Sequence, residues 1–278
     1  MKKFWCLFFM FWPIIGLIAC AISPSMNWGF PYGLPAGSPL GERIDGLYYM
    51  ILALVLIVFT GTQIGLGYVL WRGSEETDER AWYTHGSHSL EVIWSIVPAG
   101  ILLFIALYQM DVWAEYRIQD NKNFPNQLET TVAEVTARQF EWRIRYPAPD
   151  RKFATRADLV TWLRNPQSDD LYSVNDIRVP AGKKVTIHLR TEDVQHSFFV
   201  PVLRIKQDAV PGKVIPVWFE ATRADQYELL CAELCGWGHY KMKARVWAQS
   251  QEEYDAYLKQ LQHDQFDDGV SSAENDED

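Results

Sequence analysis

Several side chains that bind soft metals lie together near the end of the chain. They are Cys231, Cys235, His239 and Met242, which fall within twelve residues. Thiolate, imidazole and thioether groups suit copper, above all where electrons must move, whereas a closed zinc site takes four strong ligands and a thioether is a weak one. Gly236 and Gly238 would let the segment between the ligands fold back on itself. The spacing therefore predicts a copper site.

A further imidazole must come from elsewhere in the chain. His196 is the best candidate, because it follows a strand-like stretch and precedes the apolar run 197–202. His188 lies inside another alternating stretch, so we interpret it as an ordinary strand histidine. Taken alone, two cysteines four residues apart are often structural or a disulfide, and a lone methionine usually belongs to a core. The joint spacing of all these residue types favours a metal site instead.

Two long apolar segments precede this region. Residues 46–71 and 92–110 contain no charged side chain. At about 1.5 Å of rise per residue, each is long enough to cross a hydrocarbon core of roughly 30 Å. Tyr and Trp residues flank both segments, as is typical of membrane interfaces. The sequence therefore predicts a transmembrane helical hairpin over residues 46–116.

The N-terminal part, residues 1–45, is open to three interpretations. Lys2 and Lys3 precede the apolar run 4–22, which is the pattern of a signal peptide. The residues around Cys20 resemble a lipoprotein cleavage site, with Cys20 as the lipidated residue. The third interpretation, which we favour, is an uncleaved span or anchor. In every case the lysines stay inside, so counting spans places the chain after about Asp111 on the outer face of a bacterial cytoplasmic membrane.

After residue 116 the chain changes to short β-branched or alternating stretches, separated by Gly, Pro and Asp turns. They cover residues 130–137, 139–146, 176–180, 184–190, 197–202, 214–220 and 243–248. This pattern predicts an all-β sandwich or barrel over residues 117–263. Residues 150–172 interrupt it and indicate an inserted loop with a short helix near residues 156–164. A last helix is expected over residues 251–262.

The end of the chain and the total charge limit the function. Residues 264–278 carry seven acidic side chains and no basic one, which predicts a disordered acidic tail. The net charge is −9, and the chain has no basic stripe that could neutralise phosphates. A role in nucleic-acid binding is therefore excluded.

The motif Cys231-x-Glu233-x-Cys235-x-x-x-His239-x-x-Met242, with Asp-Val-x-His196-Ser-Phe upstream, resembles the binuclear copper (CuA) domain of cytochrome c oxidase subunit II. The resemblance implies a cupredoxin-like Greek-key barrel that binds two copper ions. It implies that both cysteines bridge the ions, and that His196, His239, Met242 and the backbone carbonyl of Glu233 complete the ligands. The side chain of Glu233 would reach a magnesium ion shared with subunit I, because carboxylate oxygen suits that cation.

The same resemblance implies the function. A c-type cytochrome would deliver electrons near Phe140 and Trp142, and the copper pair would pass them to haem in subunit I for oxygen reduction coupled to proton pumping. Subunits I and III would be partners. Taken alone, a carboxylate at the position of Glu91 is more simply interpreted as a solvated helix cap, but the resemblance favours a residue at the mouth of a proton path. Phe140 replaces the Trp through which the family usually receives electrons, so the donor surface is expected to differ.

Two other functions fit part of the pattern. The chain could be the electron-accepting subunit of a nitric oxide reductase, which also carries a copper pair. It could also be a copper-handling assembly or storage protein, although such a protein would not need this complete set of ligands on one loop. A quinol oxidase subunit has a similar framework but lacks the copper ligands, and Cys231 and Cys235 argue against it. We predict no catalytic residue of oxygen reduction in this chain.

Overall fold

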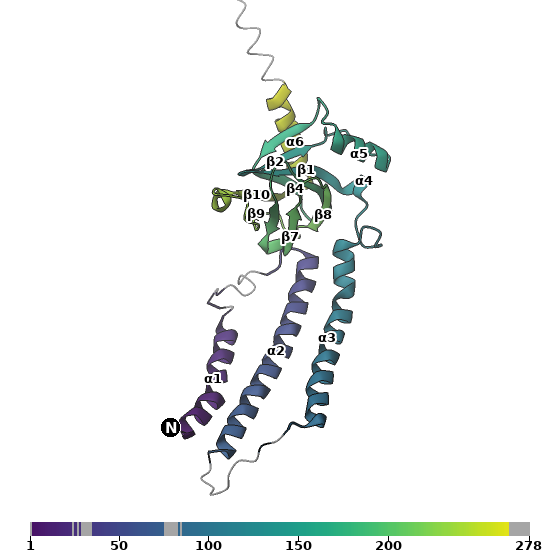
Figure 1. Cartoon of the computed structure of the whole chain (residues 1–278). Coiled ribbons are helices and arrows are strands. Elements are labelled where there is room, and N and C mark those ends of the chain that lie inside the picture. Colours follow the sequence, from purple (N-terminus) through teal and green to yellow (C-terminus); the bar gives the residue numbers. More distant parts are fainter. Residues whose placement is uncertain are drawn as a thin grey trace, which may run out of the picture. The chain divides into compact units, whose positions relative to one another are not determined.

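The structure is a computed structural model that describes residues 2–23, 25–26, 28, 35–74, 83 and 85–266. The chain divides into two compact units (Figure 1). The first comprises Met1–Pro35 and Ile44–Trp113, and the second comprises Ala36–Arg43 and Ala114–Asp278.

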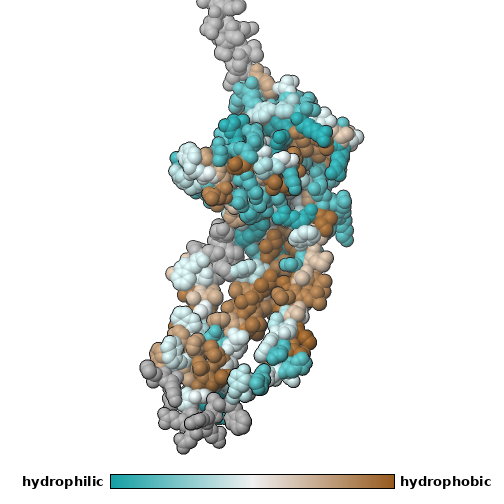
Figure 2. All heavy atoms as spheres, viewed as in Figure 1, coloured by the Kyte–Doolittle hydropathy of each residue, from teal (hydrophilic) through white to brown (hydrophobic). Residues whose placement is uncertain are grey.

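Three long helices supply the first unit. They are α1 (Lys2–Ile22), α2 (Pro39–Arg72) and α3 (His88–Arg117). All three are long and apolar enough to cross a membrane. Figure 2 shows apolar side chains gathered over the surface of these helices, as expected of surfaces that face lipid.

The helices confirm the predicted hairpin, because residues 46–71 lie within α2 and residues 92–110 within α3. The N-terminal run also forms a helix of spanning length, Phe4–Ile22, which is consistent with a third span. Cleavage and lipidation at Cys20 stay the alternatives to the uncleaved span that we favour. Most of the connection between α2 and α3, which the span count places on the inner side of the membrane, lies outside the described residues.

The second unit is a sandwich of two five-stranded sheets, with strand orders β3-β2-β1-β5-β8 and β4-β10-β9-β6-β7. The strands are β1 (Thr131–Arg138), β2 (Glu141–Tyr146), β3 (Leu171–Val174), β4 (Asp176–Pro180), β5 (Lys184–Thr191), β6 (His196–Val200), β7 (Ile205–Ala209), β8 (Ile215–Glu220), β9 (Asp225–Cys231) and β10 (Lys243–Gln249). The remaining elements are α4 (Gln127–Thr130), α5 (Arg156–Arg164), α6 (Gln251–Phe266), η1 (Pro201–Leu203) and η2 (His239–Lys241). The two sheets confirm the predicted all-β sandwich.

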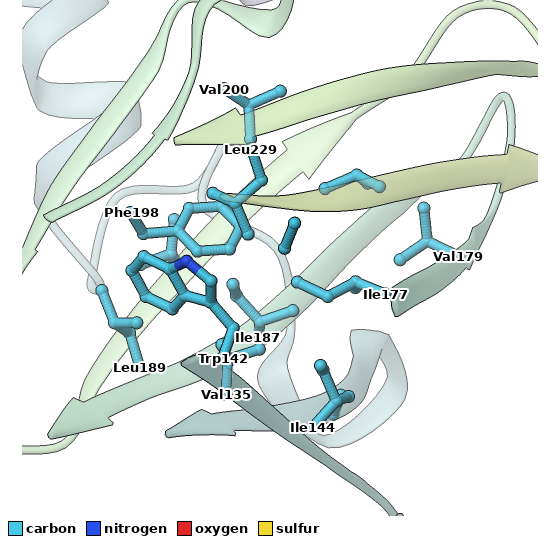
Figure 3. Close-up of a cluster of buried hydrophobic side chains, with 14 of the residues drawn as sticks. Val135, Trp142, Ile144, Ile177, Val179, Ile187, Leu189, Phe198, Val200 and Leu229 are labelled. Atoms are coloured by element: carbon cyan, nitrogen blue, oxygen red, sulfur yellow. The ribbon is translucent and has the colours of Figure 1, made fainter. Parts of the chain in front are cut away.

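The core lies between the two sheets (Figure 3). Trp142 from β2 is fully buried, and its ring lies edge-on to that of Phe198 from β6 at 5.7 Å. Ile187 and Leu189 from β5 and Leu229 from β9 are also fully buried. Side chains alternate between the two faces of a strand, so the residues beside each of these point to the opposite face of their sheet.

Secondary structure departs from the prediction in several places, among them the short helix α4, which was not predicted. The strands β3, β7 and β9 were not predicted. The last helix, α6, continues beyond residue 262 to Phe266, so the start of the predicted acidic tail is helical. The rest of that tail, residues 267–278, lies outside the described residues. The predicted insertion helix is confirmed as α5, and Thr155 and Asp158 form a capping box at its start.

A buried ionic cluster ties the insertion to the sheet. Arg145 on β2 donates hydrogen bonds to Glu134 on β1 at 2.7 Å and to Asp170 at 2.8 Å. Its guanidinium group also lies 4.2 Å from the ring centre of Trp162 on α5, and the Trp162 N–H donates to Asp170 at 2.7 Å. The side chains of Arg145, Glu134 and Asp170 are all buried. We call this set the Arg145 cluster.

Candidate metal centre

The predicted ligands meet at one end of the second sheet. His196 is the first residue of β6, and Cys231 is the last residue of β9. The two strands pair at Phe198 with Cys231, which brings the histidine segment against the cysteine. The connection from β9 to β10 then forms a loop that includes η2. The Cys231 N–H donates to the Met242 carbonyl at 3.2 Å, so the two ends of this loop are joined.

The distances within the centre are short. The Sγ atoms of Cys231 and Cys235 are 3.9 Å apart, and both residues are free cysteines. The separation is far longer than the roughly 2.05 Å of a disulfide, so the disulfide alternative does not apply to this structure. The ligand atoms of His196, Cys231 and Cys235 all lie within 4.8 Å of one another.

The other three predicted ligands are arranged around these atoms. The Met242 Sδ atom lies 3.1 Å from His196 Nδ1 and 3.8 Å from Cys235 Sγ. His239 Nδ1 lies 3.6 Å from Cys235 Sγ. The carbonyl oxygen of Glu233 lies 3.2 Å from Cys231 Sγ. All six predicted ligand groups are therefore gathered in one place.

This arrangement fits a pair of soft metal ions. With metal–sulfur bonds of about 2.3 Å, two sulfur atoms separated by 3.9 Å can both bind a single ion, and ions on the two sides of the pair could share both sulfurs. His196 and Met242 lie together on one side. His239 and the Glu233 carbonyl approach different sulfur atoms of the pair. Sulfur and imidazole ligands favour copper over magnesium or calcium.

A carboxylate orients His196. The Nε2 atom of His196 lies 2.8 Å from Asp193 Oδ1, and a carboxylate can only accept, so Nε2 carries the hydrogen and Nδ1 is free to bind a metal. Asp193 in turn accepts from the backbone N–H groups of Gln139 and Val194. Burial raises the pKa of Asp193, but these hydrogen bonds outweigh it and the pKa lies below its usual value. Sequence reasoning quoted Asp193 in the motif without giving it a role.

The two thiols have unequal acidity. Burial raises the pKa of Cys231, but hydrogen bonds with His196 and the neighbouring backbone outweigh this effect and lower it. Burial and the negative charge of Cys231 both raise the pKa of Cys235. A second thiolate beside the first is therefore costly unless a cation lies between them. The chemistry of the site thus calls for a metal that displaces the proton of Cys235.

The remaining predicted residues lie in different surroundings. Phe140 is half-buried, and its ring centre lies 5.1 Å from that of Trp237. Trp142 is fully buried, 6.3 Å from the His196 ring. The side chain of Glu233 is half-buried. Glu91 lies in the first turn of α3, in the first unit, and is exposed.

His188 lies outside this group, as predicted. It is buried within β5, and its Nε2 atom lies 3.0 Å from Thr131 Oγ1. Burial lowers the pKa of His188 to about 4, so the ring is neutral at pH 7.

Two family models match the chain. The model described as cytochrome C oxidase subunit II, periplasmic domain, matches residues 131–248, which include all six predicted ligands. The model described as cytochrome C oxidase subunit II, transmembrane domain, matches residues 25–112. The two matches fall on the β-sandwich and on the helical part of the chain.

Individual relatives agree with the family models. The alternative cytochrome c oxidase subunit 2 of Bradyrhizobium diazoefficiens is 29% identical over 245 residues, which cover 84% of this chain and 81% of the relative. Cytochrome c oxidase subunit 2 of Cereibacter sphaeroides is 30% identical over 249 residues, 81% of this chain and 78% of the relative. The solved periplasmic domain of cytochrome oxidase subunit II of Bradyrhizobium japonicum aligns with a TM-score of 0.40 at 23% identity, covering 50% of this chain and 97% of that domain.

Proposed function

The chain belongs to the cytochrome c oxidase subunit II family, and from this premise we propose that it accepts electrons at a binuclear copper centre and passes them to haem in subunit I. The single observation that supports this most strongly is the meeting of two cysteines, two histidines, a methionine and a backbone carbonyl within one small region. When bound, a copper pair would supply a one-electron acceptor whose charge is shared across both bridging sulfurs.

The residues of the chain divide into two roles. Cys231 and Cys235 would hold both ions. His196 and Met242, whose ligand atoms lie 3.1 Å apart, would bind one ion, and His239 with the Glu233 carbonyl would bind the other. Asp193 positions the His196 ring through its hydrogen bond. The strands β6 and β9 keep these groups in fixed positions, so little needs to move when the charge of the centre changes.

We propose Phe140 and Trp142 as the region of electron uptake. Phe140 is partly exposed beside the loop that carries Cys235 and His239, whereas Trp142 is enclosed against His196. A carrier, which we take to be a c-type cytochrome, would therefore approach from the Phe140 side. Trp142 would then act from within the core.

Other partners follow from the same proposal. The half-buried carboxylate of Glu233 would contribute to a magnesium site shared with subunit I. Glu91, exposed at the start of α3, would lie at the mouth of a proton path into that subunit. Subunit III would complete the complex. The spans would lie in the bacterial inner membrane with the copper domain on the periplasmic side.

Copper content and electron paramagnetic resonance of the full chain, purified in detergent and loaded with copper, test the proposal. We expect two copper ions per chain that share one unpaired electron, with hyperfine structure from two equivalent nuclei. One copper with a localised signal would contradict the binuclear centre. Copper that exchanges readily and does not change oxidation state would support a copper-handling protein.

A further inference from the structure

A cleft in the second unit lies between the insertion helix α5 and the sheet that contains β5. Its volume is about 840 Å³, which is the size of a small-molecule site. Three parts of the chain line it: the stretch from Gln119 to Leu128, the helix α5, and the end of β5 with residues 212–216. None of the six predicted metal ligands lies in this lining. We call it the insertion cleft.

Buried contacts fix the walls of the insertion cleft. Leu128, from the first wall, packs against the small apolar core under α5, which includes Trp162. The Arg145 guanidinium group donates to the Trp162 carbonyl at 3.0 Å, so the Arg145 cluster anchors α5 to the sheet. One face of α5 turns to the cleft, because its lining residues are three or four positions apart: Arg156, Leu159, Val160, Leu163 and Arg164.

The charges that line the insertion cleft all have the same sign. Of the described residues in its lining, none is acidic and five are basic: Lys122, Arg156, Arg164, Arg190 and Lys213. Asp120 lies in the same stretch of chain as Lys122 but not in the lining. The chain as a whole is acidic, with 26 basic against 35 acidic residues, so this is a local excess of positive charge. Cations gathered in a concave region raise the local concentration of anions.

The protein itself does not neutralise these cations. Within the part of the chain that the structure describes, only Arg190 of the five pairs with a carboxylate, that of Glu134 at 3.9 Å. Glu134 is held more closely by Arg145, at 2.7 Å. The one acidic residue of each adjoining helix is engaged locally: Asp158 belongs to the capping box of α5, and Glu129 of α4 accepts from a neighbouring asparagine amide. The cleft therefore offers cations to a ligand from outside.

The lining also indicates what kind of anion would fit. Guanidinium groups present forked donors that match phosphate oxygens, and three of the five cations are arginines. Apolar side chains share the lining with them: Phe124, Leu128, Leu159, Val160, Leu163 and Val214. A small inorganic anion would leave these apolar groups without a contact.

We propose that the insertion cleft binds an organic phosphate with two or more negative charges, whose body packs against the apolar part of the lining. A soluble phosphate ester or the headgroup of an anionic phospholipid would supply this chemistry. Binding needs no bond to be made or broken, and it needs no metal. The inference is therefore separate from the proposed electron transfer.

The test uses the full chain in nanodiscs of phosphatidylcholine, titrated calorimetrically with ATP free of divalent cations and with adenosine, its uncharged counterpart. The double variant Arg164→Gln, Lys213→Gln removes two cations of the cleft. Val214→Asp instead adds a carboxylate, at a lining position whose side chain is 44% exposed. The matched control is Arg223→Gln, Lys243→Gln, which removes two exposed cations outside the lining.

We expect the wild type to bind ATP at least about tenfold more tightly than adenosine, because hydrogen bonds between ionised groups are the stronger ones. Each cleft variant should weaken ATP binding about tenfold or more, while the control stays within about twofold. Raising the salt concentration from about 20 to 200 mM should weaken ATP binding several-fold, since exposed charges are screened.

A second measurement identifies the source of the phosphate. The wild type and the double variant of the cleft are placed in discs of phosphatidylcholine mixed with phosphatidylglycerol, and native mass spectrometry counts the lipids that each retains. One more phosphatidylglycerol on the wild type would assign the cleft to a lipid headgroup. Equal counts together with ATP binding would assign it to a soluble phosphate. Either result supports the inference.

Two results would overturn it. One is a wild type that does not bind ATP and retains no more phosphatidylglycerol than the variant. A chain ending at Phe266 that then binds ATP would show that residues 267–278, with six acidic side chains, fill the cleft instead. The other is equal weakening in the cleft variant and the control, which would indicate a general effect of charge. Copper content and resonance spectra of the same samples test the proposed function independently.

Discussion

The β-sandwich contains two buried polar regions that are completed in opposite ways. In the Arg145 cluster, one guanidinium group faces two carboxylates, and the chain itself supplies every charge that the group needs. In the metal centre, groups that are all potential electron donors face one another: two sulfur atoms at 3.9 Å, with imidazole nitrogens and a thioether beside them. The first region is finished by folding. The second contains a group of donor atoms that metal cations from outside would complete.

The difference separates stability from function. A buried charge without its partner is strongly destabilising, so the Arg145 cluster must form whenever the insertion packs on the sheet. The thiols and imidazoles of the metal centre hydrogen-bond to one another and to Asp193, so they can be buried at lower cost and the fold does not depend on the metal in the same way. We therefore expect damage to one region to leave the other intact, and the following variants test this separation.

Cys231→Ser should have the largest effect, because it removes one of the two sulfurs that we propose to bridge the copper ions. We expect the two-copper signal to disappear and the rate of electron acceptance to fall by more than about a hundredfold, while the unfolding temperature of the metal-free chain changes little. Copper analysis, resonance spectra and thermal unfolding of the same preparation measure this. Cys20→Ser, in the apolar helix α1, is the matched control and should keep both copper ions. A large loss of stability in the metal-free Cys231→Ser chain would contradict the separation.

Arg145→Met tests the other region. It leaves Asp170 buried without a cation, and Glu134 keeps only the partly exposed Arg190 at 3.9 Å, so we expect it to reduce the free energy of unfolding by about 3–5 kcal/mol. The resonance spectrum of the copper-loaded protein should not change at temperatures where it stays folded. Arg143→Met, on the exposed face of β2, should cost less than about 0.5 kcal/mol. If the spectrum of Arg145→Met changes, the two regions are coupled.

The triple variant Glu134→Leu, Arg145→Met, Asp170→Leu sharpens the same test. Replacing all the charges with apolar groups of similar size should restore most of the lost stability, since the penalty comes from unpaired buried charge. Chemical denaturation measures the recovery. A triple variant as unstable as the single one would show that packing, and not charge, dominates this cluster.

Asp193→Asn should have an intermediate effect, confined to the metal centre. It removes the carboxylate that fixes the His196 ring, and loss of such a partner typically weakens metal affinity about tenfold to a hundredfold. Competition with a copper chelator measures the affinity. The neighbouring exposed residue Glu192 provides the control, and Glu192→Gln should match the wild type. If the two variants have equal copper affinities, Asp193 has no role in positioning His196 for metal binding.

His188→Gln should have the smallest effect and tests acid stability apart from both regions. The pKa of His188 is about 4 in the folded chain and about 6.5 when unfolded, so the unfolded chain binds the proton more readily. The resulting stability is present above pH 6.5, falls as the pH drops towards 4, and levels off below. Between pH 7 and pH 4.5 the wild type should lose about 2 kcal/mol more than His188→Gln, in denaturation curves at both pH values. If the wild type and His188→Gln lose equal free energies of unfolding over this pH range, groups other than His188 cause the sensitivity to acid.

The sequence predicts the groups that the structure brings together because Cys231, Cys235, His239 and Met242 form an uncommon combination of residue types in one short segment, and the family resemblance adds the carbonyl of Glu233. It could not find what depends on the pairing of distant strands. The Arg145 cluster joins three segments, and nothing in the neighbours of Arg145 indicates which carboxylates it meets. The sequence also does not show that Trp237 is exposed, since an aromatic residue in a loop can either pack against the protein or face solvent.

The missed strands have a physical explanation. β3 and β7 are the outer strands of their sheets, with solvent on one side, so their short sequences carry little of the apolar pattern of a central strand. β9 is central, and its buried residues Tyr227, Leu229 and Cys231 do alternate. The sequence therefore contains the signal of a strand. It was not predicted because the motif of metal ligands begins at Cys231, the last residue of β9.

The pairing of β6 with β9 also has a consequence for the order of events during biogenesis. Within the loop, the ligands from Cys231 to Met242 are neighbours in sequence and can come together in a nascent chain at a small entropic cost. His196 arrives only when two strands from distant parts of the sequence have aligned. A chain that has not closed its sandwich therefore offers only an incomplete set of ligands. Only a chain whose sandwich has closed could then bind the full complement of metal. Metal binding would therefore distinguish folded chains from unfolded ones before they join a complex.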